Sequence, residues 1–245
     1  MTDTNERSGV AMAIFFFVLA SLVISAIYAL LQFLPTSFGF LPEIEDEHLR
    51  GEYFLMLIQC ILGIIVLFLP SVLERRLQIA IPNFMFVLFA LFLYASIFLG
   101  EVRSFYYRIP HWDLILHGFS GLMLGALSFS VITLLNETSS MTSTLTPAFV
   151  AVFAFSFAVS IGVIWEIYEF GVDGLFELNM QKHSTATGSP LIGRAALRDT
   201  MYDLILNSIG ALTMALVGYV SLKDHKGWIR GLLVRRVGSQ ETEDN

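Results

Sequence analysis

Carboxylate, imidazole and amide side chains recur at the ends of apolar segments in the second half of this sequence. Seven of them could do chemistry together: Asp113, His117, Glu166, Glu169, Asp199, Asp203 and Asn207. Oxygen and imidazole ligands of these types suit a divalent cation. The same groups could instead pass protons, because carboxyl and imidazole groups are the usual acid–base side chains. The residue types therefore predict a polar binding pocket for a cation, a proton or a polar head group.

The spacing of these residues indicates that each group lies on one face of a helix. His117 follows Asp113 by four positions, and Glu169 follows Glu166 by three. Asp199, Asp203 and Asn207 follow one another at intervals of four. Residues three or four apart are neighbours on a helix surface. Because a charged side chain that faces lipid is costly, we expect the three polar faces to point toward one another.

The elements that carry these residues are predicted to be membrane helices. Hydrophobic residues make up 56% of the 245-residue chain and charged residues 14%, whereas a soluble domain carries about 25% charged residues. A helix needs about 20 apolar residues to cross the hydrocarbon core. Six segments qualify: 9–34, 52–70, 79–100, 113–135, 147–172 and 199–221. Their apolar runs are continuous, which favours helices over a barrel. We therefore predict an all-α, polytopic membrane helix bundle that forms a single domain over 1–245.

Alternation of the six spans across the membrane brings the polar residues to one face. The third span ends, the fourth begins, the fifth ends and the sixth begins at the same side of the bilayer, whichever way the protein is inserted. All seven candidate residues lie near these ends. We therefore expect one pocket, built from the fourth, fifth and sixth spans, that opens toward one membrane face.

The distribution of Lys and Arg predicts the orientation. With the N-terminus inside, eight basic residues lie on the inner side: Arg7, Arg75, Arg76, Lys223, Lys226, Arg230, Arg235 and Arg236. Six lie on the outer side: Arg50, Arg103, Arg108, Lys182, Arg194 and Arg198. By the positive-inside rule we expect a multi-pass protein of the bacterial plasma membrane, with both termini and a basic tail, 222–245, in the cytoplasm. A net charge of -7 excludes a nucleic-acid partner and leaves the lipid bilayer as the expected surroundings.

Four of the candidate residues are the expected metal ligands: His117, Glu166, Asp199 and Asp203. The chain has no His-Glu-x-x-His motif and only one cysteine, so no specific metal motif identifies the ion. Two other interpretations remain open. Asp113 and Asp199 could be N-terminal helix caps, and the carboxylates could form a buried ionic network with Arg194 and Arg198.

Three classes of function fit these residues. The first is a membrane protein that binds or transports a cation, a proton or a polar head group. The second is a metal-dependent enzyme acting on a lipid or cell-envelope precursor, in which His117 or Glu166 is the general base. The third is a structural or partner-binding membrane protein.

The polar segments also resemble a known family. HWDLILHGFSGLMLG, WEIYEFGVD and GRAALRDTMYDLILNSIGAL, within about 100–220, are similar to the YjdF-like bacterial inner-membrane proteins, which lack an established reaction. More distantly they resemble the VanZ-like membrane proteins, some of which are linked to glycopeptide-antibiotic resistance. The resemblance implies the same site residues. It departs from the YjdF-like pattern at Arg198-Asp199 and Tyr202-Asp203, where Gly-Asp and Trp-Asp are frequent.

Overall fold

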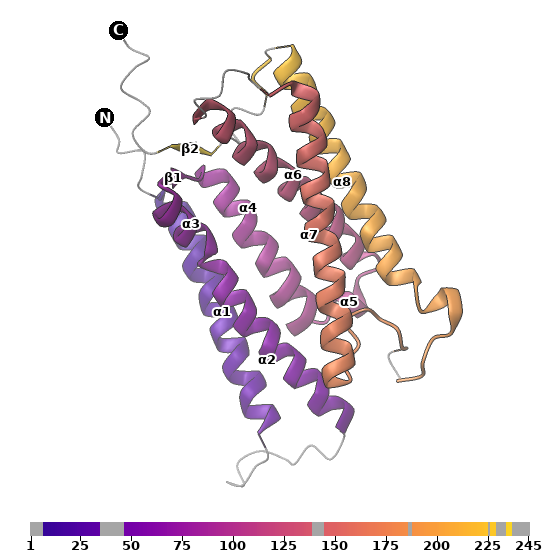
Figure 1. The fold of residues 1–245 in the computed structure, drawn as a ribbon. Coiled ribbons are helices and arrows are strands. Elements are labelled where there is room, and N and C mark those ends of the chain that lie inside the picture. The colour runs from indigo at the N-terminus through magenta and orange to yellow at the C-terminus, as the bar shows by residue number, and fades with distance from the viewer. Residues whose placement is uncertain are drawn as a thin grey trace.

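The protein is a bundle of long helices (Figure 1). The computed structural model describes residues 7–34, 47–138, 145–185, 188–224, 226–228 and 234–236. Within these residues six helical stretches are long and apolar enough to cross a membrane: Gly9–Phe33, Gly51–Leu77, Asn83–Val102, Trp112–Leu135, Pro147–Phe176 and Arg198–Lys223. The predicted all-α bundle of six membrane helices is confirmed.

The bounds of the helices and strands follow in chain order, and a capping hydroxyl and a proline mark two of the helix starts. The elements in order are α1 (Gly9–Phe33), α2 (Glu47–Leu67), α3 (Leu69–Leu77), β1 (Ile79–Ala80), α4 (Asn83–Leu93), the π-helical segment η1 (Tyr94–Val102), α5 (Phe105–Arg108), α6 (Trp112–Thr138), α7 (Pro147–Phe176), the 3-10 turn η2 (Gly193–Ala195), α8 (Arg198–Lys223) and β2 (Arg235–Arg236). The Ser8 hydroxyl caps α1 by accepting from the Ala11 amide at 3.2 Å. Pro70 lies in the first turn of α3, where its missing N–H leaves no hydrogen bond unmade. The helical stretch Gly51–Leu77 therefore continues past position 70, with a break between α2 and α3 close to the expected end of the second span.

The bundle consists of two halves with separate hydrophobic cores. In the first half α1, α2, α4 and η1 pack around a cluster that includes Leu22, Cys60 and Phe86. In the second half α6, α7 and α8 pack around a cluster that includes Phe129 and Ala154. The two halves meet chiefly where α4 and η1 pack against α6.

Helices α6 and α8 approach each other closely through small residues. A Cβ atom at Gly121 would collide with the carbonyl oxygen of Asn207, and one at Gly210 would collide with that of Gly118. Glycines of this kind let membrane helices bring their backbones into contact. The contact sets the position of the polar residues of α8 relative to those of α6.

The two ends of the bundle carry different features. At one end β1 pairs antiparallel with β2, with Ile79 opposite Arg236. The start of α1 and the end of α8 lie at this same end (Figure 1). At the other end lie η1, α5, the start of α6, the end of α7 and the start of α8, as the alternation of spans predicts. Of the expected basic tail, 222–245, the structure describes 222–224, 226–228 and 234–236; the rest lies outside the described residues.

Substitution of Gly121 by Ala should destabilise the protein, because the added methyl group would force α6 away from α8. Overpacking of this kind costs about 1–3 kcal/mol. The measurement is thermal unfolding of the purified protein in detergent. Gly171→Ala is the matched control, since nothing lies within 4 Å of a Cβ at that position on α7. Equal unfolding temperatures for the two variants would contradict the close α6–α8 contact.

Candidate functional site

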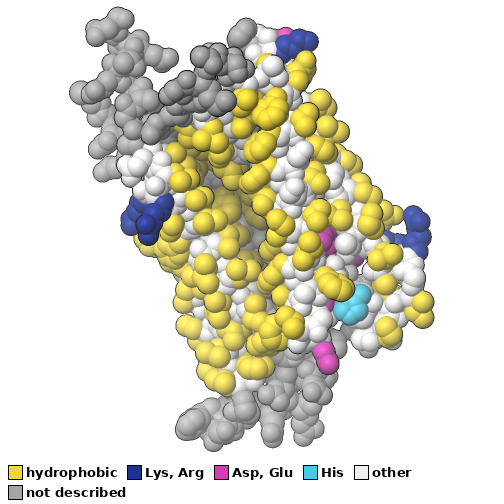
Figure 2. All heavy atoms as spheres, viewed as in Figure 1, with side chains coloured by type: hydrophobic (Ala, Val, Ile, Leu, Met, Phe, Trp, Pro, Cys, Tyr) yellow, Lys and Arg dark blue, Asp and Glu magenta, His cyan; other side chains and the backbone are white. Residues whose placement is uncertain are grey.

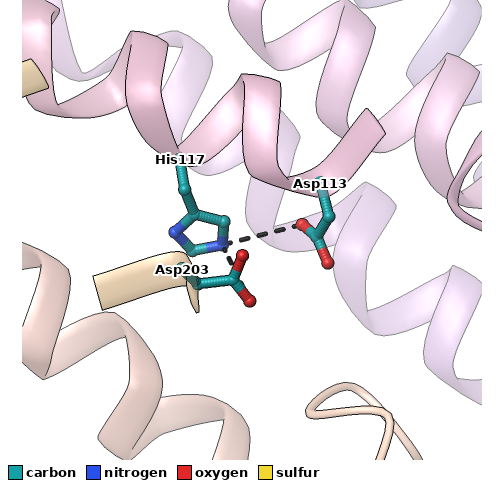
Figure 3. Close-up of side chains that lie close together, drawn as sticks. All are labelled: Asp113, His117 and Asp203. Atoms are coloured by element: carbon teal, nitrogen blue, oxygen red, sulfur yellow. Dashed lines mark ion pairs between the residues drawn. The ribbon is translucent and has the colours of Figure 1, made fainter. Parts of the chain in front are cut away.

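A histidine and two aspartates converge at the interface of α6 and α8. His117 Nε2 lies 3.6 Å from Asp113 Oδ1 and 3.9 Å from Asp203 Oδ2. Figure 3 shows Asp113 and His117 projecting from one helix and Asp203 from another toward a common point. One ligand atom from each of the three residues lies within 4.8 Å of the others. Asp203 is only 1% exposed and His117 9%. We call these three residues the trio.

Glu166 adds a third carboxylate from α7. Its Oε1 lies 4.0 Å from His117 Nε2, and its side chain is buried. Neither Glu166 oxygen meets the geometry of a hydrogen bond among the described residues, although the Gln181 and Thr200 side chains lie near this carboxylate, and Asp203 Oδ1 also has no partner there. Buried polar atoms without partners are rare and costly in proteins. The site therefore has unused acceptor capacity, which a proton or a cation would satisfy.

Lys182 supplies a positive charge from the segment between α7 and α8. Its Nζ donates to Asp113 Oδ2 and lies 3.4 Å from Asp199 Oδ2. Burial lowers the pKa of Lys182, but the attraction of Asp113 and Asp199 outweighs it and the net pKa is raised. Lys182 thus stays protonated beside the trio. Arg194 and Arg198, which the sequence offered as partners for the carboxylates, are exposed.

The segment that carries Lys182 is held in place by Asp173. The Asp173 carboxylate accepts from the backbone amides of Met180 and Gln181 at 2.7 and 3.0 Å. The Gln181 side chain then donates to the Glu166 carbonyl oxygen at 3.4 Å and to Thr200 Oγ1 at 3.0 Å. These contacts tie the segment to both α7 and α8. They bring Lys182 to the site although it lies far from Asp113 in the sequence.

Asn207 connects the three helices one turn deeper than the trio. The side chain is fully buried; its Oδ1 accepts from Ser120 on α6 at 3.3 Å and its Nδ2 donates to the Ala158 carbonyl on α7 at 3.4 Å. A Cβ at Gly162 would collide with the Asn207 amide, so Gly162 provides its space. On α7, Glu169 accepts from the indole of Trp165 at 2.8 Å.

The structure divides the seven candidate residues into three groups. Asp113, His117 and Asp203 come together with Glu166 beside them. Asp199 lies next to Lys182 and outside the trio, whereas Asp113, which was not among the four expected metal ligands, belongs to the trio. Glu169 and Asn207 have hydrogen-bond partners of their own. Sequence reasoning missed Lys182, because a single lysine in an irregular connection carries no periodic signal.

The distances allow one metal ion to bind several of these groups. Two ligand atoms bonded to one ion at about 2.0–2.2 Å lie at most roughly 4.4 Å apart. The separations of 3.6, 3.9 and 4.0 Å from His117 Nε2 fall below this limit, and the three ligand atoms of the trio lie within 4.8 Å of one another. One imidazole with two or three carboxylates is a donor set that suits Mn²⁺ or Zn²⁺. The residues present therefore fit a divalent cation.

Comparison with known proteins gives matches of unknown activity. The family model described as "Predicted membrane protein (DUF2238)" matches residues 44–224. An uncharacterised protein of Thermotoga maritima is 29% identical over 153 residues, which cover 62% of this chain and 70% of the relative. No solved structure matches the chain. Neither of the two matches is to a VanZ-like protein, and they give that more distant resemblance no support.

The raised pKa of Lys182 predicts that this lysine resists an amine-reactive reagent at about pH 9, because only the neutral amine reacts. Each unit by which the pKa rises lowers the neutral fraction about tenfold. Asp113→Asn should lower the pKa of Lys182 and speed its modification several-fold. Mass spectrometry of labelled peptides measures the rates, and Lys223 and Lys226, at the other end of α8, are internal controls. An unchanged rate at Lys182 in Asp113→Asn would show that Asp113 does not control its charge.

Proposed function

This chain belongs to the family of predicted membrane proteins designated DUF2238, and on that premise we propose that it binds a divalent transition-metal cation inside its membrane domain. The ligands are Asp113, His117 and Asp203, and Glu166 is the fourth. Transport through the site and metal-dependent catalysis would both begin with this binding step.

The unpartnered acceptors carry the proposal. Glu166 and Asp203 are buried, and three of their four carboxylate oxygens have no hydrogen-bond partner among the described residues. A protonated His117 would not supply these oxygens with hydrogen bonds, because its Nε2 lies 3.6 Å or more from every carboxylate oxygen with which it pairs. Distances of this length are too great for hydrogen bonds. An ion bound among these atoms would satisfy them all at once.

The ligand types favour Mn²⁺ or Zn²⁺ over Ca²⁺ and Mg²⁺. Calcium takes six to eight oxygen ligands, and magnesium keeps several waters, whereas an imidazole is a typical ligand of the transition metals. The trio brings one such imidazole into a small, buried site. A single histidine with carboxylates also differs from the multi-histidine set of carbonic anhydrase-type zinc sites.

We place the protein in the bacterial plasma membrane, with both termini in the cytoplasm and the site toward the outer face. Eight of the Lys and Arg residues then lie inside and six outside, as counted above, which agrees with the positive-inside rule. The three polar segments support assignment to the YjdF-like subgroup. An outward-facing site would take its cation from the cell exterior or periplasm.

Metal analysis of the purified protein tests the proposal. The wild type should bind about one equivalent of Mn²⁺ or Zn²⁺ after loading and desalting. Asp203→Asn and His117→Gln should weaken binding by at least about 100-fold, since loss of even an outer-shell partner costs roughly 10–100-fold. Asp199→Asn should have a smaller effect, because Asp199 lies outside the trio.

Asp224→Asn is the matched control, with the same chemical change at an exposed position at the other end of α8. It should bind the metal as the wild type does. The proposal is wrong if the folded wild type retains no metal under any loading condition. It is equally wrong if Asp203→Asn and Asp224→Asn bind the metal with the same affinity.

A further inference from the structure

A cavity between the two halves of the bundle joins the candidate site to an apolar space. Its volume is about 270 Å³, and residues of α2, α4, η1, α6 and α7 line it. Its charged and histidine lining residues are Glu101, Asp113, His117, Glu169 and Lys182. The remainder is lined by apolar side chains, among them Leu62, Val66, Phe89, Phe92 and Leu124. Figure 2 shows the surface hollowed between the two halves, with hydrophobic side chains along the recess.

The cavity has features of a binding site as well as of a packing gap. Protein interiors are close-packed, and voids much larger than a water molecule are few. The π-helical segment Tyr94–Val102 also lines it, through Ser96, Ile97 and Glu101. π-Helical turns are rare and occur frequently at functional sites. Neither observation depends on whether a cation is bound at the trio.

The division of the lining restricts the ligand to an amphiphile. A polar solute would leave the apolar part unfilled, and a plain hydrocarbon would leave the charged end without a partner. Small-molecule pockets measure about 300–1,000 Å³, so a cavity at the lower limit suits one hydrocarbon chain and not two. A molecule with one chain and one polar head therefore fits the space.

The proposed cation and Lys182 indicate which head group binds. A cation at the trio could complete its coordination with phosphate oxygens, as carboxylate-bound cations commonly do, and the Lys182 ammonium group beside it is a donor to the same oxygens. Four arginines at the same membrane face are exposed: Arg103, Arg108, Arg194 and Arg198. Exposed basic residues of this kind attract anionic ligands.

We propose that the cavity binds a single-chain lipid phosphate from the membrane, with its chain between α2, α4 and α6 and its phosphate at the cation held by the trio. This inference rests on the proposed cation site. The phosphate of the lipid would be a ligand of the cation bound there.

A photoreactive dodecyl phosphate tests the inference in protein reconstituted into phosphatidylcholine nanodiscs. With Mn²⁺ present, mass spectrometry should find label on cavity residues such as Leu62 and Phe92. EDTA should abolish this labelling, and an excess of unlabelled dodecyl phosphate should compete. A photoreactive dodecanol, which has the chain without the phosphate, should label these residues far less, and inorganic phosphate should not compete.

Two substitutions on α2 separate the cavity from the lipid-facing surface. Leu62→Trp should fill the cavity and lose most of the labelling while it keeps the affinity for Mn²⁺. Ile65→Trp is the matched control, because Ile65 is 64% exposed and does not line the cavity, so its labelling should equal that of the wild type. If Leu62→Trp does not fold, the wild-type comparisons with EDTA and dodecanol still decide the question.

The outcomes distinguish the two proposals. If the wild type binds Mn²⁺ but the probe labels only lipid-facing residues, the lipid inference fails and the cation site stands. If dodecanol labels the cavity as strongly as dodecyl phosphate does, the phosphate assignment is overturned. If the cavity is labelled in a protein that binds no cation, the proposed function fails, and the cation-bound phosphate fails with it.

Discussion

The need to neutralise carboxylates inside a membrane bundle governs this structure. A helix satisfies its own backbone in lipid, but it offers nothing to a buried Asp or Glu side chain. Glu166 and Asp203 are therefore directed inward, toward His117, and their helices must pack closely enough to exclude lipid from the site. The glycines between α6 and α8, the buried Asn207 and the docked Lys182 all serve that requirement.

Much of the fold could be predicted from the sequence because membrane physics leaves few choices. Long, continuously apolar runs predict helices, and alternation across the bilayer predicts which helix ends share a face. The spacing of Asp113 and His117, and of Asp199 and Asp203, indicated the helix faces that point inward. Pro70 marks the boundary between α2 and α3, beyond which the chain continues as a helix to Leu77.

The composition of the site was harder to predict because it depends on helix rotation and on irregular backbone. Asp199 and Asp203 lie on one face of α8, and only the close packing against α6 decides which of them meets His117. Lys182 reaches the site through hydrogen bonds to Asp173 from backbone amides, which no periodic pattern encodes. The π-helical segment beside the cavity likewise follows from a local change of hydrogen-bond register, which its residue types do not predict.

Lys182 also bears on ionic selectivity. Lys182 is a counter-ion to Asp113 and Asp199 that is covalently part of the same chain. It is therefore present at the site at a high effective concentration. A monovalent ion that displaced it would exchange one positive charge for another and would have to compete with a partner that cannot diffuse away. A divalent ion brings an additional charge to the carboxylates. At the proposed cation site, the tethered ammonium group would thereby disfavour the abundant monovalent ions around the cell before ligand geometry has any effect.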